Sequence, residues 1–377
     1  MPKSLLPLLL LCILLATPAC DDAIRWEAPA EPSPTPSAGG LYILCEGLFN
    51  RNNSLLAYYD LRTGLHRSFI DDDLRGSDKT SYDVFKQANG RKLGDTANDL
   101  QRYGNRLWCA VSVSSQVEVM DLSSGRSLRQ IPLFTEEGVG RQPRCFAFDG
   151  GKAYVCNFDG TVARIDTATL CVDGLVHVGR NPDGICAAAG KLYVSNSGGL
   201  DTTHPDSTVS VVDLDTFAEV RRLTVRENPG AIHADGAGNV YVVSRGRYDE
   251  GLADYDPRLH RIDSRTDEVV ETFDYSAVDF CINGSWAYLY GYGLGGGGIR
   301  VMDTRTGRIV DTDFVKDGTP FVHVYALAVD PSTGYVYVAD AQHYTTPGLI
   351  YAFTPQGQCC ACFEAKGLNP NSLVFWP

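Results

Sequence analysis

The chain has 377 residues, and its 33 Lys and Arg against 46 Asp and Glu give a formal net charge of −13 at pH 7. Such a chain lacks the basic footprint that sequence-independent binding to phosphate backbones requires, so we expect no nucleic acid among its partners. The length allows one large domain or two ordinary ones with a sizeable core.

The N-terminus has the pattern of a targeting segment. Lys3 supplies a short positive region, residues 5–16 form an apolar run that is short for a membrane-spanning helix, and small residues precede Cys20. This arrangement resembles a bacterial lipoprotein cleavage site, which implies a signal peptide at 1–19 and lipidation of Cys20. Asp21 and Asp22 resemble the surface-export signal of some Gram-negative lipoproteins. An ordinary secretory signal with an incidental cysteine is the alternative.

A tether is expected to follow the lipid anchor, over residues 20–40. Its second half reads APAEPSPTPSAGG, a composition that cannot bury a core and stays extended. The lipid anchor would attach the chain to a membrane, and the tether would hold a folded domain at 41–377 away from that surface.

Two strand patterns recur along residues 41–377. The first is an apolar strand with an aromatic residue, in the copies LYIL (41), LWCAV (107), AYVCN (153), LYVSN (192), VYVVS (240), AYLYG (287) and VYVAD (336). The second is a strand that ends in Asp before a turn, in the copies YYDLRTG (58), VMDLSSG (119), RIDTAT (164), VVDLDT (211), RIDSRT (261), VMDTRTG (301) and the decayed YAFTPQG (351). We expect each Asp to accept hydrogen bonds from turn N–H groups, a structural role.

These seven copies predict an all-β fold, a seven-bladed β-propeller of four-stranded antiparallel blades. NPDGICAAA and NPGAIHADG open the fourth and fifth blades, but no such strand precedes Leu41. LNPNSLVF at Leu368 matches this opening pattern and has no other place in the repeat. The C-terminal strand is therefore predicted to pair into blade 1 and close the ring.

The pattern NPxxI…GKLYVSNSGG…TVSVVDLDT resembles the YVTN-type, YncE-like seven-bladed propellers, from about Gly39 to the end. LYILCEG, LGDTANDLQRYGNRLW, QVEVMD, VSRGRY and DAQHYTTPGLIY together resemble the BtuG-type surface lipoproteins that capture cobalamin. The resemblance implies cobalamin (vitamin B12) or another corrinoid as a transported ligand rather than a cofactor. It also implies a TonB-dependent outer-membrane transporter as partner, and a lipid-anchored location on the outer membrane at the cell surface.

The long connections are expected on one face of the propeller. They join the second and third strands of each blade, or link consecutive blades, whereas the remaining turns are short. This one-sided distribution indicates a binding face. A corrin ring carries many amides, which suit aromatic planes beside hydrogen-bonding groups. The candidate ligand-binding residues are Phe49, Asn50, Arg51, Asn98, Phe158, Asn196, Arg245, Arg247, Tyr248, Tyr292, His343 and Tyr344.

Two other functions remain open. A propeller scaffold for interaction or adhesion would bind a protein or a glycan through the same face. A lactonase-like enzyme would need carboxylates or imidazoles that converge on the central channel, with Asp95, Asp99, Asp183, His233, Asp279 and His323 as candidates. The sequence has neither a nucleophile–base spacing nor a metal-ligand spacing, so we predict no enzyme, no catalytic residue, no metal and no cofactor.

Twelve cysteines are present, of which Cys12 would leave with the signal peptide and Cys20 would carry lipid. Buried free thiols are expected inside predicted strands, at Cys45, Cys109, Cys145, Cys156, Cys186 and Cys281. On a regular strand, Cys360 and Cys362 would share one face and Cys359 the other, a poor start for a zinc site. A disulfide from this group to a neighbouring strand is an alternative.

Overall fold

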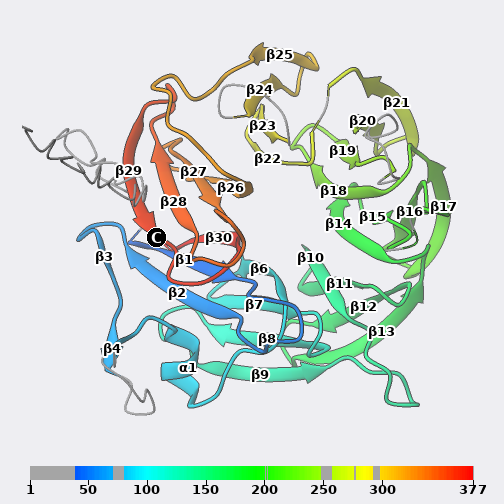
Figure 1. Cartoon of the computed structure of the whole chain (residues 1–377). Coiled ribbons are helices and arrows are strands. Elements are labelled where there is room, and N and C mark those ends of the chain that lie inside the picture. The colour runs from blue at the N-terminus through cyan, green and yellow to red at the C-terminus, as the bar shows by residue number, and fades with distance from the viewer. Residues whose placement is uncertain are drawn as a thin grey trace, which may run out of the picture.

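The computed structural model describes residues 39–70, 80–199, 201, 203–247, 257–275, 277–291 and 298–376. Within these ranges, seven four-stranded antiparallel sheets stand around a central axis, which confirms the predicted propeller (Figure 1). No helix in these ranges has the length and apolar character needed to cross a membrane. Cys20, the predicted signal peptide and nearly all of the predicted tether lie outside the described residues.

Each blade has an inner strand, two middle strands and an outer strand. The inner strands of blades 1 to 7 are β30 (Pro370–Trp376), β6 (Ala97–Tyr103), β10 (Pro143–Asp149), β14 (Pro182–Ala188), β18 (Pro229–Ala234), β22 (Asp279–Asn283) and β26 (Val324–Val329). The second strands are β1 (Gly40–Cys45), β7 (Arg106–Val111), β11 (Lys152–Asn157), β15 (Lys191–Asn196), β19 (Asn239–Ser244), β23 (Trp286–Tyr290) and β27 (Val336–Asp340). The third strands are β2 (Leu55–Asp60), β8 (Gln116–Asp121), β12 (Thr161–Asp166), β16 (Thr208–Asp213), β20 (Arg258–Asp263), β24 (Ile299–Asp303) and β28 (Leu349–Phe353). The outer strands are β3 (Leu65–His66), β9 (Ser127–Pro132), β13 (Cys171–His177), β17 (Ala218–Thr224), β21 (Glu268–Phe273), β25 (Arg308–Asp311) and β29 (Cys359–Glu364).

The link between blades 1 and 2 carries the remaining elements, β4 (Phe69–Ile70), β5 (Thr80–Ser81) and α1 (Val84–Asn89). Asp83 caps α1 by accepting a hydrogen bond from the N–H of Lys86 at 3.1 Å, and Gly90 ends it at φ 65°. The helix contacts β2 and β9, so this insertion covers the junction of the two blades.

Ring closure follows the prediction. The inner strand β30 pairs antiparallel with β1, so that Leu41 lies opposite Phe375 and Ile43 opposite Leu373. Trp376 packs against the ring of Tyr58, with a centroid distance of 5.7 Å. The first and last strands of the propeller therefore share one blade, which leaves no open junction in the ring.

The Asp at the end of the third strand has the expected structural role in blades 1 to 6. In blade 3, Asp166 Oδ1 accepts hydrogen bonds from the N–H groups of Ala168 at 3.0 Å and Thr169 at 2.8 Å. The same kind of bond forms in five other blades, at Asp60, Asp121, Asp213, Asp263 and Asp303. In blade 7, the hydroxyl of Thr354 accepts the N–H of Gln358 at 3.3 Å instead.

The inner strands begin with an unusual backbone. In five blades the residue before the strand has a left-handed φ between 47° and 58°, at Thr96, Gln142, Asn181, Asn228 and Asn369. Asn tolerates this conformation better than most residues, which explains the Asn-Pro openings in the sequence. The register then shifts within the first residues of the strand in six blades, a β-bulge. Bulges re-aim side chains, and here they set the residues that surround the axis.

The thiol predictions hold in part. The ten described cysteines are free, with Cys45, Cys109, Cys156 and Cys186 buried and Cys145 and Cys281 half-buried. The predicted geometry of the C-terminal group is wrong. A bulge in β29 places Ala361 opposite Ala352 but Cys359 opposite Phe353. Cys359 and Cys362 consequently pack into one core cluster, and Cys360 into another.

Candidate functional site

A cavity of about 800 Å³ lies on the propeller axis. Its walls come from the inner strands of all seven blades, which converge in the centre of Figure 1. Because strands alternate in direction, the connections between second and third strands open at the same end as the links between blades. In blade 4, residues 197–207 connect β15 to β16, whereas two residues separate β14 from β15. We call this end the loop-rich face, and the opening of the cavity there the channel mouth.

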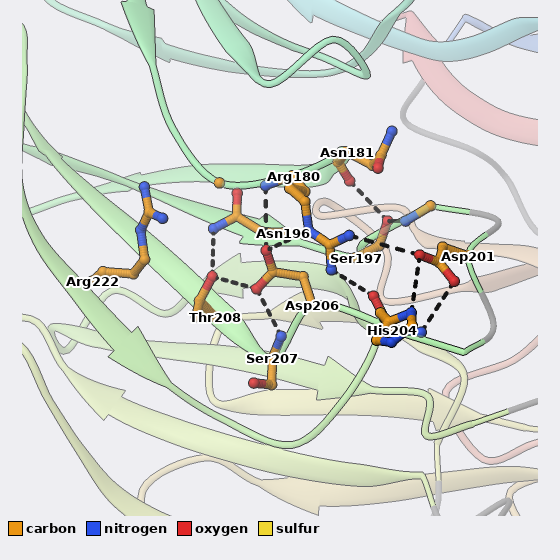
Figure 2. Close-up of polar contacts among 12 residues, drawn as sticks. Arg180, Asn181, Asn196, Ser197, Asp201, His204, Asp206, Ser207, Thr208 and Arg222 are labelled. Atoms are coloured by element: carbon orange, nitrogen blue, oxygen red, sulfur yellow. Dashed lines mark hydrogen bonds and ion pairs between the residues drawn. The ribbon is translucent and has the colours of Figure 1, made fainter.

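The β15–β16 loop shows how this face is built (Figure 2). Arg180 donates its backbone N–H to Asp206 at 3.3 Å and its guanidinium to the carbonyl of His204. Asp206 also accepts from the N–H of Ser207 and the hydroxyl of Thr208, both at 2.7 Å. These hydrogen bonds therefore fix the described residues His204 and Asp206 of this loop.

Asn196 is a correction to the expected rim residues. Its side chain is completely buried at the end of β15. The side-chain amide donates to the hydroxyls of Thr208 at 3.0 Å and Ser210 at 2.9 Å, as Figure 2 shows in part. Asn196 therefore holds β15 to β16 and is not on the surface of the loop-rich face.

Phe49, Asn50 and Arg51 lie on the β1–β2 loop and are exposed, with Phe49 70% exposed. Asp95 fixes this loop, because its two carboxylate oxygens accept the N–H groups of Asn50 at 3.0 Å and Asn52 at 2.8 Å. Asp95, a candidate under the enzyme hypothesis, thus acts as a loop anchor here.

Three charged groups meet at the channel mouth. Asp183 Oδ1 accepts from the Nε of Arg144 at 3.0 Å and its Nη2 at 2.7 Å, and Asp183 Oδ2 accepts from Arg245 at 2.7 Å. The carboxylate is 7% exposed, against 27% and 26% for the two arginines. Burial alone would raise the pKa of Asp183, but the charges of Arg144 and Arg245 outweigh it and hold the pKa well below its ordinary value.

Gly230 gives Arg245 its route to this cluster. A Cβ at position 230 would lie 2.4 Å from the guanidinium carbon of Arg245. Position 230 follows the first residue of β18, where the neighbouring inner strand β14 carries Asp183. Because Gly230 has no side chain, the guanidinium of Arg245, which comes from the β19–β20 connection, has room to reach Asp183.

Two further candidates lie beside the cluster. The guanidinium carbon of Arg144 sits 5.7 Å from the ring centroid of Phe158, a cation–π distance. Asn98 lines the cavity, and its backbone carbonyl accepts the side-chain amide of Asn371 at 3.2 Å. The structure therefore brings Phe158, Asn98 and Arg245 together around Arg144 and the channel mouth.

The opposite wall of the mouth contains Glu46 and aromatic rings. Tyr325 donates its hydroxyl to Glu46 Oε2 at 2.7 Å. The Tyr344 ring lies 5.9 Å from that of Tyr325, at 75°, and 4.8 Å from the His323 ring. Burial raises the pKa of Glu46, and the Tyr325 hydrogen bond offsets part of that effect.

Deeper in the channel, three titratable groups face the cavity. Burial raises the pKa of Asp99 to about 6, against the lowering effect of hydrogen bonds from the Phe146 N–H and the Gln101 amide. His233 Nε2 and Asp279 Oδ1 are 4.0 Å apart, with the side chains 47% and 40% exposed. Burial raises the pKa of Asp279 and lowers that of His233, and the proximity of each to the other offsets part of its shift.

For the remaining candidates, the described residues show no contact with the charged and aromatic groups of the mouth. Arg247 forms a two-bond pair with Glu227, at 2.7 Å for each bond. His343 is exposed on the β27–β28 loop. Tyr248 and Tyr292 lie outside the described residues.

The sequence analysis missed Arg144, Glu46 and Tyr325. Arg144 follows Pro143 just as Asp183 follows Pro182, so alignment of the inner strands alone would have placed both at the mouth. Glu46 and Tyr325 had no comparable signal. In the described part of the chain, no group of three or more His, Cys, Asp or Glu side chains is arranged to hold a metal ion.

Solved structures share the fold. A quinoprotein alcohol dehydrogenase-like protein from Bacteroides thetaiotaomicron is 15% identical over 90% of this chain and 78% of its own, with a TM-score of 0.61. Hydrazine synthase from Kuenenia stuttgartiensis is 16% identical over 67% and 74%, with a TM-score of 0.53. The computationally designed protein Ika8 is 15% identical over 90% and 92%, with a TM-score of 0.53. These identities show a common propeller fold alone. No protein-family model matches the chain, and no curated protein matches it.

Proposed function

We propose that the chain is a cell-surface lipoprotein that captures cobalamin or a related corrinoid at the channel mouth and passes it to a TonB-dependent outer-membrane transporter. One observation carries the proposal: aromatic rings and hydrogen-bonding side chains gather at the channel mouth, on the loop-rich face. The resemblance of the blade motifs to the cobalamin-capturing lipoproteins supports the choice of ligand.

The chemistry of the mouth suits a broad ring with peripheral amides. Phe158 and Tyr344 supply aromatic surface, and Phe49 is exposed on a connection of the same face. The guanidinium groups of Arg144 and Arg245 can donate to amide carbonyls, and Glu46 can accept from amide N–H groups. The proposal leaves out Asn196, because it is buried.

Rigidity favours capture without chemistry. The loop contacts of Arg180 and Asp95 and the ion pairs of Asp183 fix much of the mouth. A preformed site limits the ordering cost that binding has to offset.

Calorimetric titration of the full chain, purified in detergent, with cyanocobalamin tests the proposal. We expect saturable binding that weakens at least tenfold in a Phe158→Ala/Tyr344→Ala variant. The matched control is Trp286→Ala, because Trp286 is an exposed aromatic at the start of β23, on the opposite face. No heat with the wild type would refute corrinoid capture, whereas binding that both variants retain would move the site elsewhere.

The scaffold function has one observation in its favour. Phe49, Phe134 and Val139 are exposed apolar residues on connections of the loop-rich face. Such residues are typical of contacts with another protein. If the chain captures a corrinoid, its binding to cyanocobalamin and its binding to the transporter can be measured as separate steps. Binding to a protein or a glycan without any binding to cyanocobalamin would favour the scaffold.

The prediction that the chain is not an enzyme stays a prediction. Four of the six residues named for a lactonase-like activity line the cavity, and His233 and Asp279 are neighbours there. Lactone hydrolysis by the wild type that a His233→Gln variant loses would favour the enzyme.

A further inference from the structure

Glu46 stands apart among the carboxylates of the channel mouth. Asp183 is neutralised by two arginines, but in the described part of the chain Glu46 forms no ion pair, and Tyr325 is the side chain that donates to it. Its carboxylate lines the cavity and is partly buried. Burial raises the pKa of Glu46, and the Tyr325 hydrogen bond and the more distant positive charge of Arg144 offset only part of that effect.

The Tyr325 ring reaches this carboxylate through its hydroxyl, and further aromatic rings lie next to Tyr325. The rings of Tyr325 and Tyr344 meet at 75° with a centroid distance of 5.9 Å, which makes a corner, and the hydroxyl of Tyr325 points to Glu46. The ring of His323 flanks Tyr344 at 4.8 Å. A carboxylate beside perpendicular aromatic rings is the chemistry that recognises an organic ammonium group, through charge and cation–π attraction together.

The corner is held in place from behind. Asp340 is completely buried at the end of β27 and accepts the N–H groups of Val322, His323 and Gln342, each at 2.8 Å. These bonds join the link before β26, which carries His323, to the β27–β28 loop, which carries Tyr344. Tyr325 lies on β26 itself and is held by its hydrogen bond to Glu46. The rings are therefore positioned before any ligand arrives.

We propose that Glu46, Tyr325 and Tyr344 form a binding site for an organic ammonium ion, of the quaternary, choline-like class. The bulky, weakly hydrated cation would lie in the corner of the two rings with its charge towards Glu46. An inorganic divalent cation fits less well, because it needs several oxygen ligands and one carboxylate is present here. Asp99 and Asp279 deeper in the cavity would add to the attraction, whereas Arg144 and Arg245 at the mouth would reduce it. This site does not depend on corrinoid capture.

Calorimetric titration of the full chain in detergent with choline tests the site, with 3,3-dimethyl-1-butanol as the uncharged molecule of the same shape. We expect saturable choline binding and affinity at least about tenfold weaker for the alcohol, because the charge supplies most of the attraction. Glu46→Gln and Tyr344→Leu should each weaken choline binding about tenfold. The matched control Glu136→Gln removes one charge from an exposed residue and should leave the affinity unchanged.

Three outcomes would overturn the inference. They are the absence of choline binding, equal affinity for choline and the alcohol, and choline binding that survives both Glu46→Gln and Tyr344→Leu. A thermal melt of each variant shows whether it is folded, and Tyr344→Leu keeps the test open if Glu46→Gln disturbs the mouth. Cyanocobalamin titration of the same samples reports separately on corrinoid capture, so the failure of one proposal leaves the other testable.

Discussion

Asp183→Asn should destabilise the propeller through the two arginines that it leaves behind. Removing one partner of a buried ion pair costs about 3–5 kcal/mol. Here Arg144 and Arg245 keep 27% and 26% of their side-chain surface exposed to the channel, so screening by water reduces the cost. We expect about 2 kcal/mol, which corresponds to a Tm lower by ~3 °C for a domain with an unfolding entropy of ~0.7 kcal/mol/K.

Thermal unfolding followed by circular dichroism measures this effect, and its pH dependence tests the cause. The pKa of Asp183 is depressed in the folded state, so its contribution is fully present above the ordinary Asp pKa of about 4 and is lost as the pH falls further. The destabilisation by Asp183→Asn should therefore be constant from pH 7 to about pH 5 and shrink below about pH 4. A triple variant with Arg144→Gln and Arg245→Gln added should recover most of the loss. A single variant as stable as the wild type, or a triple variant less stable than the single one, would refute the reasoning.

Three other changes test separate features. Asp99→Asn should raise the stability at pH 7.5 by up to about 3 kcal/mol and have little effect at pH 4, because a folded-state pKa raised to about 6 costs stability only when the group must ionise. Denaturant unfolding at both pH values measures this, and an equal effect at both would contradict it. Truncation after Leu368 removes β30 from blade 1, so we expect that the truncated chain aggregates or no longer unfolds in one cooperative thermal transition. A truncated chain with an unchanged thermal transition would show that ring closure is dispensable. Brief alkylation with iodoacetamide, followed by mass-spectrometric mapping, should label Cys171 first among the ten described cysteines. Cys171 is exposed, whereas burial raises the pKa of Cys45, Cys109 and Cys186. Faster labelling of any of these three would show that their strands open.

The fold could be predicted from the sequence because each blade repeats the same local chemistry. An Asp before a turn and an aromatic apolar strand recur at fixed places, and the orphan opening LNPNSLVF could fit only in blade 1. The face that carries the long loops follows from strand direction alone. The β29 bulge escaped prediction, because no residue in CCACF marks where the pleat shifts.

The candidate site was predicted less well than the fold. Exposed loop residues such as Phe49 could be found because length and polarity mark the loops. Asn196 looked like one of them, although its position as the last residue of β15 directs it into the blade. Arg144 could have been found, because it follows a strand-opening Pro as Asp183 does. Tyr325 lies on an inner strand where the sequence suggests packing alone, and its place at the mouth depends on the bulge in that strand.

The bulged start of the inner strands makes the mouth modular. One residue per blade, directly after the first residue of the strand, supplies Asn371, Asn98, Arg144, Asp183, Gly230 and Tyr325 in blades 1 to 5 and 7. Other residues form the strand that pairs with each position and, in blades 1 to 5, the left-handed turn before it. Diversifying these positions in a combinatorial library should therefore yield propellers that share one scaffold and differ in the small molecules they select.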